Sequence, residues 1–236
     1  MNFLPIALVF IFIIPIIIIL GLIKQVGKRC DFYEYIFLSS GSVLLSILLF
    51  LGLYSWKVGQ SLFSTIWNYF RQALINSPID GSQILSVYHQ WGVFENFTTA
   101  EQLIDFTIGQ ISMVVPAAIL VFSFIYGVFL FLLLRVIIKK METPVPAVPA
   151  FEHWIVPRRM AFGLLLLLLG FFLVNALGFA DVEVAQYTVT LLISFMFSVT
   201  GLSVVWFFLK AGQVPGPLRW LLAILVYILL GFALPI

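Results

Sequence analysis

Charged residues are scarce in this sequence of 236 residues: only 9% are Asp, Glu, Lys or Arg, whereas 63% are hydrophobic. A soluble globular domain has about 25% charged residues and about 45–50% apolar residues. The excess of apolar side chains therefore has to face something other than water, and lipid is the obvious candidate. The formal net charge of +2 is too small to indicate a nucleic-acid partner.

Cysteine and histidine are nearly absent. Cys30 stands alone, so no internal disulfide can form and the redox compartment stays open. His89 and His153 are far apart in the sequence and have no neighbouring metal-ligand residues, so neither predicts a zinc or haem site. We therefore expect neither a metal nor a cofactor.

The sequence also lacks the short motifs of common catalytic sites. It contains no His-Glu-x-x-His, no phosphate-binding Gly-Lys-Ser/Thr loop and no Gly-x-Ser-x-Gly. No charged side chain falls in the middle of any apolar run, which argues against a pump, a proton antiporter or an intramembrane metalloprotease. We expect a protein that is not an enzyme.

What the sequence does contain is long apolar runs. A bilayer core of roughly 30 Å needs about 20 apolar residues, and backbone amides in lipid have to bond within their own segment, so such runs are helices. The first run is too long for a signal peptide and lacks a basic start. The sequence therefore predicts an all-α polytopic bundle, with residues 1–236 as a single integral membrane domain. The predicted spans are 4–23, 35–55, 111–138, 160–180, 187–209 and 217–235.

Lysine and arginine are distributed unevenly between the two sets of connections. If all six runs cross, every Lys and Arg falls on one side except Lys57 and Arg71. Basic residues mark the cytoplasmic face of a membrane protein. The asymmetry predicts that both termini are outside and that the loops 24–34, 139–159 and 210–216 are cytoplasmic.

The external stretch 56–110 is the longest connection. Residues 58–76 have the pattern of an amphipathic helix, with apolar side chains at helical spacing and polar ones opposite. Trp56, Trp67 and Tyr69 suit the headgroup region of a bilayer. This helix could lid a cavity, or it could rest on the membrane or on the other helices. Its apolar positions are Leu62, Phe63, Ile66, Phe70 and Leu74.

A second, much longer helix is predicted at the end of this stretch. Thr98 and Glu101 have the spacing of a capping box, which would start a helix near Thr99. That helix could continue to Lys140, a length of about 60 Å, so its first turns would project beyond the bilayer. Pro116 is where we expect a kink. The residues at 77–81 are typical of a turn.

The cytoplasmic stretch 143–157 is rich in proline, which favours an extended strap in polyproline II conformation. The strap is too apolar for a free linker, so we expect Phe151 and Trp154 to be covered. One candidate cover is the membrane interface, which tryptophan favours. The other is a second protein, since rigid proline segments make good docking edges. The expected contact residues are Phe151, Trp154, Pro157, Arg158 and Arg159.

Small and mildly polar residues share one face of the run 187–209. Thr190, Ser194, Ser198 and Gly201 recur at helical spacing, and small residues so placed let helix backbones approach closely. Asn175 is the polar side chain of the run 160–180 that is most costly to bury in a membrane. These residues form a helix-packing face or part of a ligand-lined groove, and both interpretations stay open. The serines of the second run follow the same pattern at Ser39, Ser42 and Ser46.

From the third run onward the chain resembles a specific family. Pro116 lies in a long apolar run that ends in basic residues. The strap pattern Phe151-x-x-Trp154-x-x-Pro157, the pair Gly201-Leu202 and a turn follow it. That turn reads Val214-Pro215-x-Pro217-Leu218-Arg219. The combination resembles the YybS-like family of predicted bacterial multi-pass membrane proteins over residues 105–230, and more loosely over the whole chain.

The resemblance implies a place in the bacterial inner membrane. It also implies a distant similarity to the membrane substrate-binding subunits of energy-coupling-factor vitamin transporters. Members of the family usually carry further apolar helices before the segment that resembles residues 1–25, and a polar tail after the last span. We therefore expect a short member of the family or an incomplete copy.

Two functions follow as expectations. The first is a substrate-capture subunit of a small-molecule transporter, and the second is a non-transporting scaffold or accessory subunit of a membrane protein complex. The expected partners are the lipid bilayer and one or more proteins in the membrane, with the small-molecule ligand left open. A partly polar pocket among the external halves of the spans would distinguish the two functions, because a scaffold needs none.

Overall fold

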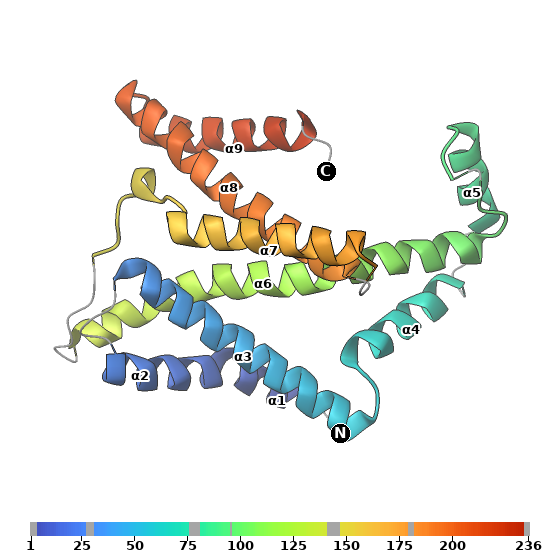
Figure 1. The fold of residues 1–236 in the computed structure, drawn as a ribbon, viewed down its shortest axis with the longest axis horizontal. Coiled ribbons are helices and arrows are strands. Elements are labelled where there is room, and N and C mark those ends of the chain that lie inside the picture. Colours follow the sequence, from blue (N-terminus) through green and yellow to red (C-terminus); the bar gives the residue numbers. More distant parts are fainter. Residues whose placement is uncertain are drawn as a thin grey trace. The chain divides into compact units, whose positions relative to one another are not determined.

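The computed structural model describes residues 4–26, 31–75, 81–94, 96–140, 147–178 and 182–233, and all the regular secondary structure in these segments is helical (Figure 1). The predicted all-α fold is thus confirmed for the described residues. Cys30, the residues 77–80 of the predicted turn and the first residues of the strap, 143–146, lie outside them. The chain divides into two compact units. Unit 1 comprises Met1–Arg29 and Tyr33–Pro144, and unit 2 comprises Cys30–Phe32 and Val145–Ile236.

Each of the six predicted apolar runs overlaps helical structure. The first run comprises α1 (Leu4–Leu8), the π-helical turn η1 (Val9–Ile13) and α2 (Ile14–Val26). The other five overlap α3 (Phe32–Val58), α6 (Ala100–Lys140), α7 (Arg158–Ala176), α8 (Glu183–Ala211) and α9 (Gly216–Ala233). The predicted run 160–180 extends beyond the end of α7, because the chain turns at Leu177 and Gly178. Within the described residues, three helices are long and apolar enough to cross a membrane: α3, α6 as far as Ile137, and α8. The apolar parts of the first run, α7 and α9 are shorter.

The core of unit 1 forms where α3 and α6 pack closely. Gly127 of α6 is buried, and a Cβ atom added to it would lie only 2.5 Å from Oγ of Ser40 and 2.6 Å from its Cα. The rings of Tyr35 and Phe131, both fully buried, meet with centroids 5.4 Å apart. The serine face predicted on α3, which comprises Ser39, Ser42 and Ser46, is buried. Glycine and serine therefore serve at this site as small residues that admit a neighbouring backbone.

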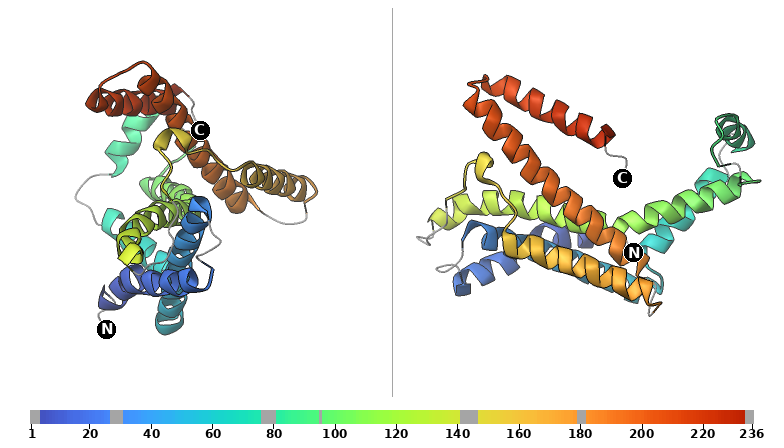
Figure 2. Two further views of the ribbon diagram at one scale, coloured as in Figure 1. Left: turned by 90° about the vertical axis from the view of Figure 1, so that its left-hand side faces the viewer. Right: turned by 45° about the horizontal axis from the view of Figure 1, so that its top comes forward.

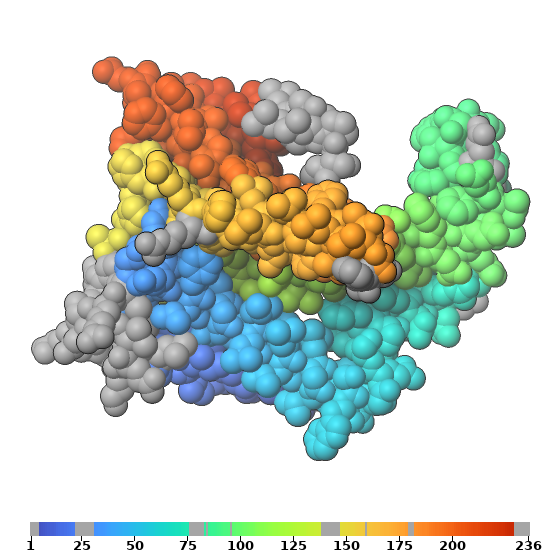
Figure 3. Space-filling model, viewed as in Figure 1, coloured from blue at the N-terminus to red at the C-terminus, as the bar shows by residue number. Residues whose placement is uncertain are grey.

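The connection between α3 and α6 contains two further helices, α4 (Leu62–Ile75) and α5 (Gly81–Gln90). The predicted amphipathic helix is confirmed as α4, whereas α5 was not predicted. A forked ion pair holds α4 to α6: Arg71 donates from Nε to Asp105 Oδ1 (2.6 Å) and from Nη2 to Oδ2 (3.1 Å). These hydrogen bonds lower the pKa of Asp105. The apolar side chains Tyr69 and Phe70 stay exposed, and α4 and α5 both lie on the surface of unit 1 (Figure 3).

The start of α6 differs from the prediction by one residue. The hydroxyl of Thr99 accepts the backbone N–H of Gln102 (3.3 Å), and the side-chain oxygen of Gln102 accepts the backbone N–H of Thr99 (3.3 Å). The capping box is therefore formed by Thr99 and Gln102 instead of Thr98 and Glu101. The carboxylate of Glu101 instead lies 4.0 Å from Arg71, to whose charge it is attracted. The continuous helix from this point to Lys140, with Pro116 inside it, is as predicted.

In unit 2, α7 packs on α8, and α9 folds back from the end of α8 (Figure 2). The turn between α8 and α9 is the Val-Pro-x-Pro-Leu-Arg segment. Gln213, the residue just before this segment, is left-handed at φ 56°, and Val214 donates its N–H to the carbonyl of Leu209 (3.1 Å). Arg219 donates from Nε to the carbonyl of Val214 (2.7 Å), and its guanidinium lies 5.7 Å from the ring centroid of Trp206. This motif therefore has a structural role, because its arginine closes the turn.

Candidate functional site

An open pocket of about 380 Å³ lies in unit 2, where the end of α7 meets the beginning of α8. The described residues that line it are all polar. Asn175 comes from the last turn of α7, and the other four belong to the first two turns of α8. The lining residues are Asn175, Glu183, Gln186, Tyr187 and Thr190.

Local backbone chemistry explains why these residues converge. The helix α7 ends after Ala176, and Gly178 adopts a left-handed conformation (φ 68°) that glycine accepts without steric cost. Its N–H donates to the carbonyl of Asn175 (3.0 Å), so the chain turns sharply just beyond that residue. The chain then enters α8 at Glu183, which places an acidic side chain in the first turn, where the helix dipole favours a negative charge.

The chemistry of the pocket suits binding. One carboxylate, two amides, one phenol and one hydroxyl provide both hydrogen-bond donors and acceptors. The hydroxyl of Thr190 donates to the carbonyl of Gln186 (2.9 Å), so its oxygen is left to accept a bond from a ligand. None of the five lining residues is positively charged. The arrangement suits a small polar molecule that carries hydrogen-bond donors.

Two of the predicted face residues, Asn175 and Thr190, are brought together here. Ser194, Ser198 and Gly201 lie further along α8 and do not line the pocket. The hydroxyl of Ser198 donates to the carbonyl of Ser194 (2.8 Å), which satisfies it within the helix. Gly201 is exposed, and an added Cβ atom would meet no heavy atom within 4 Å. Whether these three residues pack against another helix or contact a ligand stays a prediction.

The residues that the sequence prediction missed are Glu183, Gln186 and Tyr187. Glu183 and Gln186 precede the predicted span 187–209, and Tyr187 is its first residue. A signal was available, since Glu183 with Tyr187 and Gln186 with Thr190 are spaced four residues apart and so share helix faces. What the sequence does not reveal is that these faces meet Asn175 across the connection.

The described part of the strap packs on α8. Residues Phe151–His153 form the short 3-10 helix η2, and the ring of Phe151 meets that of Trp206 of α8 edge to face, with centroids 5.9 Å apart. Trp154 packs against Phe151 (5.7 Å), and its Nε1 donates to the carbonyl of Pro149 (3.2 Å). The cover expected over Phe151 and Trp154 thus comes in part from the chain itself.

Polar contacts fasten the same segment. Glu152 forms an ion pair with Lys210 at the end of α8, and the hydrogen bond from Lys210 lowers the pKa of Glu152. Val156 donates its N–H to the hydroxyl of Thr200 (3.4 Å). Pro157 occupies the N-cap position of α7, whose first residues are Arg158, which is exposed, and Arg159, whose side chain is not described.

No group of three or more His, Cys, Asp or Glu side chains that could hold a metal ion occurs in the described part of the chain.

A family model described as "Predicted membrane protein (DUF2232)" matches residues 1–236. No curated protein and no solved structure shows a significant match to the chain.

Proposed function

This chain belongs to the DUF2232 family of predicted membrane proteins, and we propose that it is the substrate-capture subunit of a small-molecule transporter in the bacterial inner membrane. The observation that carries the proposal is the polar pocket formed by Asn175 of α7 and the first two turns of α8. The resemblance to YybS-like proteins, with their distant similarity to substrate-binding subunits of energy-coupling-factor transporters, points in the same direction.

The proposed topology has six crossings and places this pocket on the external side. Three helices have the length and composition for a crossing, and the shorter apolar helices at Pro5–Gly21, Met160–Ala176 and Gly216–Ile228 would supply the other three. Lys and Arg concentrate in the loops 24–34, 139–159 and 210–216, which supports a cytoplasmic location for those loops. The connection between α7 and α8, which the pocket adjoins, then faces outward.

Capture without catalysis fits the chemistry of the pocket. Its five described lining residues offer hydrogen bonds and include no serine, cysteine, histidine or lysine. No charged residue lies in the middle of an apolar run, so a coupled partner would provide the energy for transport. These features support a binding subunit.

The alternative of a non-transporting scaffold has less support from the fold. Its motivation was an apolar strap that needs a cover, and the strap finds contacts with Trp206, Thr200 and Lys210 of α8. The scaffold function is therefore treated as an outcome of the test below.

The capture function predicts that a small polar molecule co-purifies with the protein in a mild detergent and is identified by mass spectrometry. Asn175→Leu and Thr190→Val should each lower retention of that molecule about tenfold, because each removes a hydrogen-bonding group from the pocket. Ser198→Ala is the matched control, since this residue lies on the same face of α8 but outside the pocket. A molecule retained equally by all three variants would place binding elsewhere. A co-purifying protein in the absence of any small molecule would favour the scaffold.

The topology has its own test. Cysteines placed at Ser86 of α5 and at Ala147 of the strap should react with a membrane-impermeant maleimide from opposite sides of the membrane. Both side chains are exposed, so access does not limit the reaction. The native Cys30 is replaced by serine in both variants. Labelling of both positions from one side would contradict the six-span arrangement.

A further inference from the structure

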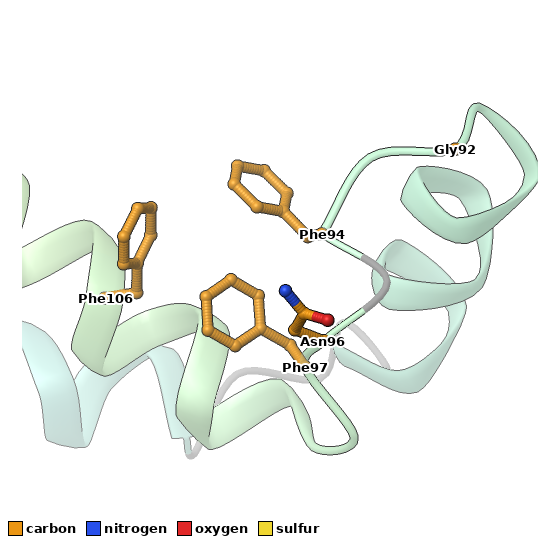
Figure 4. A pocket seen from close by; sticks show the side chains of 5 residues that line it. All are labelled: Gly92, Phe94, Asn96, Phe97 and Phe106. Atoms are coloured by element: carbon orange, nitrogen blue, oxygen red, sulfur yellow. The ribbon is translucent and has the colours of Figure 1, made fainter.

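A second pocket, of about 450 Å³, lies in unit 1 between the end of α5 and the first turns of α6. The described residues that line it all come from the segment 92–106, so this part of the pocket is built by a local fold of the chain. Figure 4 shows the rings of Phe94, Phe97 and Phe106 gathered beside the amide of Asn96. None of these residues belongs to the site proposed for substrate capture.

The three phenylalanine rings form a continuous aromatic wall. The centroids of Phe94 and Phe97 are 5.5 Å apart, those of Phe94 and Phe106 are 5.7 Å apart, and those of Phe97 and Phe106 are 5.2 Å apart. The rings are inclined to one another at 42° to 63°, so their faces point in different directions. Tyr88 supports the wall from behind, edge to face with Phe94 at 5.4 Å.

The backbone of this loop is held in an unusual conformation. Phe94 has a φ of 58°, in the left-handed region that bulky residues rarely adopt, and Gly92 just before it has a φ of 69°. Nε2 of His89 lies 3.1 Å from the carbonyl oxygens of both Phe94 and Phe97, so one N–H group donates to both and fixes the two residues together. Strain of this kind is commonly kept where it presents side chains to a ligand.

The segment that forms this pocket is acidic, and the basic side chain of Arg71 in α4 lies beside two of its carboxylates. The segment 77–110 contains four acidic residues, Asp80, Glu95, Glu101 and Asp105, and no Lys or Arg. Arg71 of α4 neutralises Asp105, and Glu101 remains largely exposed. The pocket wall itself has no cationic side chain. An aromatic surface in an acidic setting attracts a cation that is also apolar enough to lie against rings.

From the ring geometry and the charge pattern we propose that this pocket binds a methylated ammonium group. Such a group carries a diffuse positive charge and has a weakly hydrated surface, so the faces of several aromatic rings can replace its water. The group could belong to a free solute such as choline or to the headgroup of phosphatidylcholine. The amide of Asn96 would bond to the oxygen that follows the ammonium group in either molecule.

Binding of choline to the protein in nanodiscs of pure phosphatidylglycerol tests the proposal, with ligand-observed nuclear magnetic resonance as the readout. The neutral isostere of choline, in which carbon replaces the ammonium nitrogen, should bind about tenfold more weakly, because it has the same shape without the charge. Equal binding of the two molecules would make the pocket merely apolar, and no binding of choline would overturn the proposal outright.

Substitutions of the phenylalanines test whether the aromatic rings are responsible for the binding of choline. Phe97→Leu keeps an apolar side chain but removes the aromatic face, and it should weaken choline about tenfold, whereas Phe97→Trp should retain binding. Phe122→Leu, at an exposed position of α6 outside the pocket, is the matched control. Phe106→Leu removes a second ring of the pocket and should have the same effect. Because both residues pack on other rings, thermal unfolding is used to verify that each variant is folded. Choline binding that is unchanged in both pocket variants would contradict the assignment.

The lipid composition distinguishes the two sources of the group. If the natural occupant is a headgroup, nanodiscs that contain phosphatidylcholine should abolish the binding of free choline. If it is a free solute, choline should bind equally well in both kinds of nanodisc.

Discussion

The two long helices α6 and α8 have similar composition and very different surroundings. Their most apolar stretches have mean hydropathy values of 2.7 and 2.1, yet 33% of the residues are buried in the first and only 11% in the second. In α6 the buried residues include Leu130, Phe131 and Leu134, three large side chains. In α8 they are Thr188, Met196 and Ser203.

The comparison teaches that hydropathy identifies a membrane helix without saying what the helix touches. A span such as α6 is held by side chains of its own unit. A span such as α8 is contacted by α7 and α9 and, near its C-terminal end, by the strap through Trp206 and the ion pair at Lys210, yet most of its side chains stay at least partly exposed. The rest of its apolar surface is left for lipid or for another membrane protein.

The largest effect is expected from removal of the aromatic contacts of the strap. The double variant Phe151→Ala, Trp154→Ala should lower stability by about 2–4 kcal/mol, because it takes away two half-buried rings that cover α8. Thermal unfolding in detergent measures the change. Phe172→Ala, which removes an exposed ring from α7, should have little effect.

The result for this double variant also distinguishes a structural strap from the docking strap of the scaffold alternative. Unchanged stability of the double variant would make the strap a loose linker and would weaken the contrast between α6 and α8. Loss of a co-purifying protein with unchanged stability would instead assign the strap to a partner, as in the scaffold alternative.

A smaller and more direct comparison places the same substitution in both helices. Gly127→Ala should lower stability by about 1–3 kcal/mol, because the added Cβ atom collides with Ser40 of α3 and overpacks the contact. Gly201→Ala should be neutral or stabilising by up to about 1 kcal/mol, since that position is open and alanine is the better helix former. Both are read from thermal unfolding. The reverse order of the two effects would contradict the assignment of α6 as the packed helix.

The smallest effect concerns pH. Lys210 lowers the pKa of Glu152 in the folded state, so the stability from this ion pair is present above the unfolded-state pKa of about 4.3 and is lost as the pH falls through the lower, folded-state value. Lowering the pH from 7 to 3 should therefore reduce the melting temperature of the wild type by more than it reduces that of Glu152→Gln. Equal losses would mean that the pair contributes nothing, as is common for exposed ion pairs.

The helices could be predicted well because each prediction rested on local chemistry. Each of the six apolar runs overlaps a helix, α4 lies within the predicted amphipathic segment, and α6 extends to Lys140 as expected. The error in the capping box arose because Thr98 with Glu101 and Thr99 with Gln102 have equal spacing. The attraction of Glu101 to Arg71, thirty residues away in the sequence, favours the second pair. The helix α5 was missed because its sequence has only a weak apolar pattern and follows a turn.

The sequence alone determined that the protein is an all-helical membrane protein. In lipid, a long apolar run has to satisfy its backbone hydrogen bonds within itself, and a helix does so with local contacts only. Only the tertiary structure decided which side chains share a site: Asn175 with Thr190 across a turn, Phe94 with Phe106 across a helix start, and Gly127 against Ser40. These pairings depend on how helices and turns are rotated and crossed, and that geometry is set by packing between residues far apart in the chain.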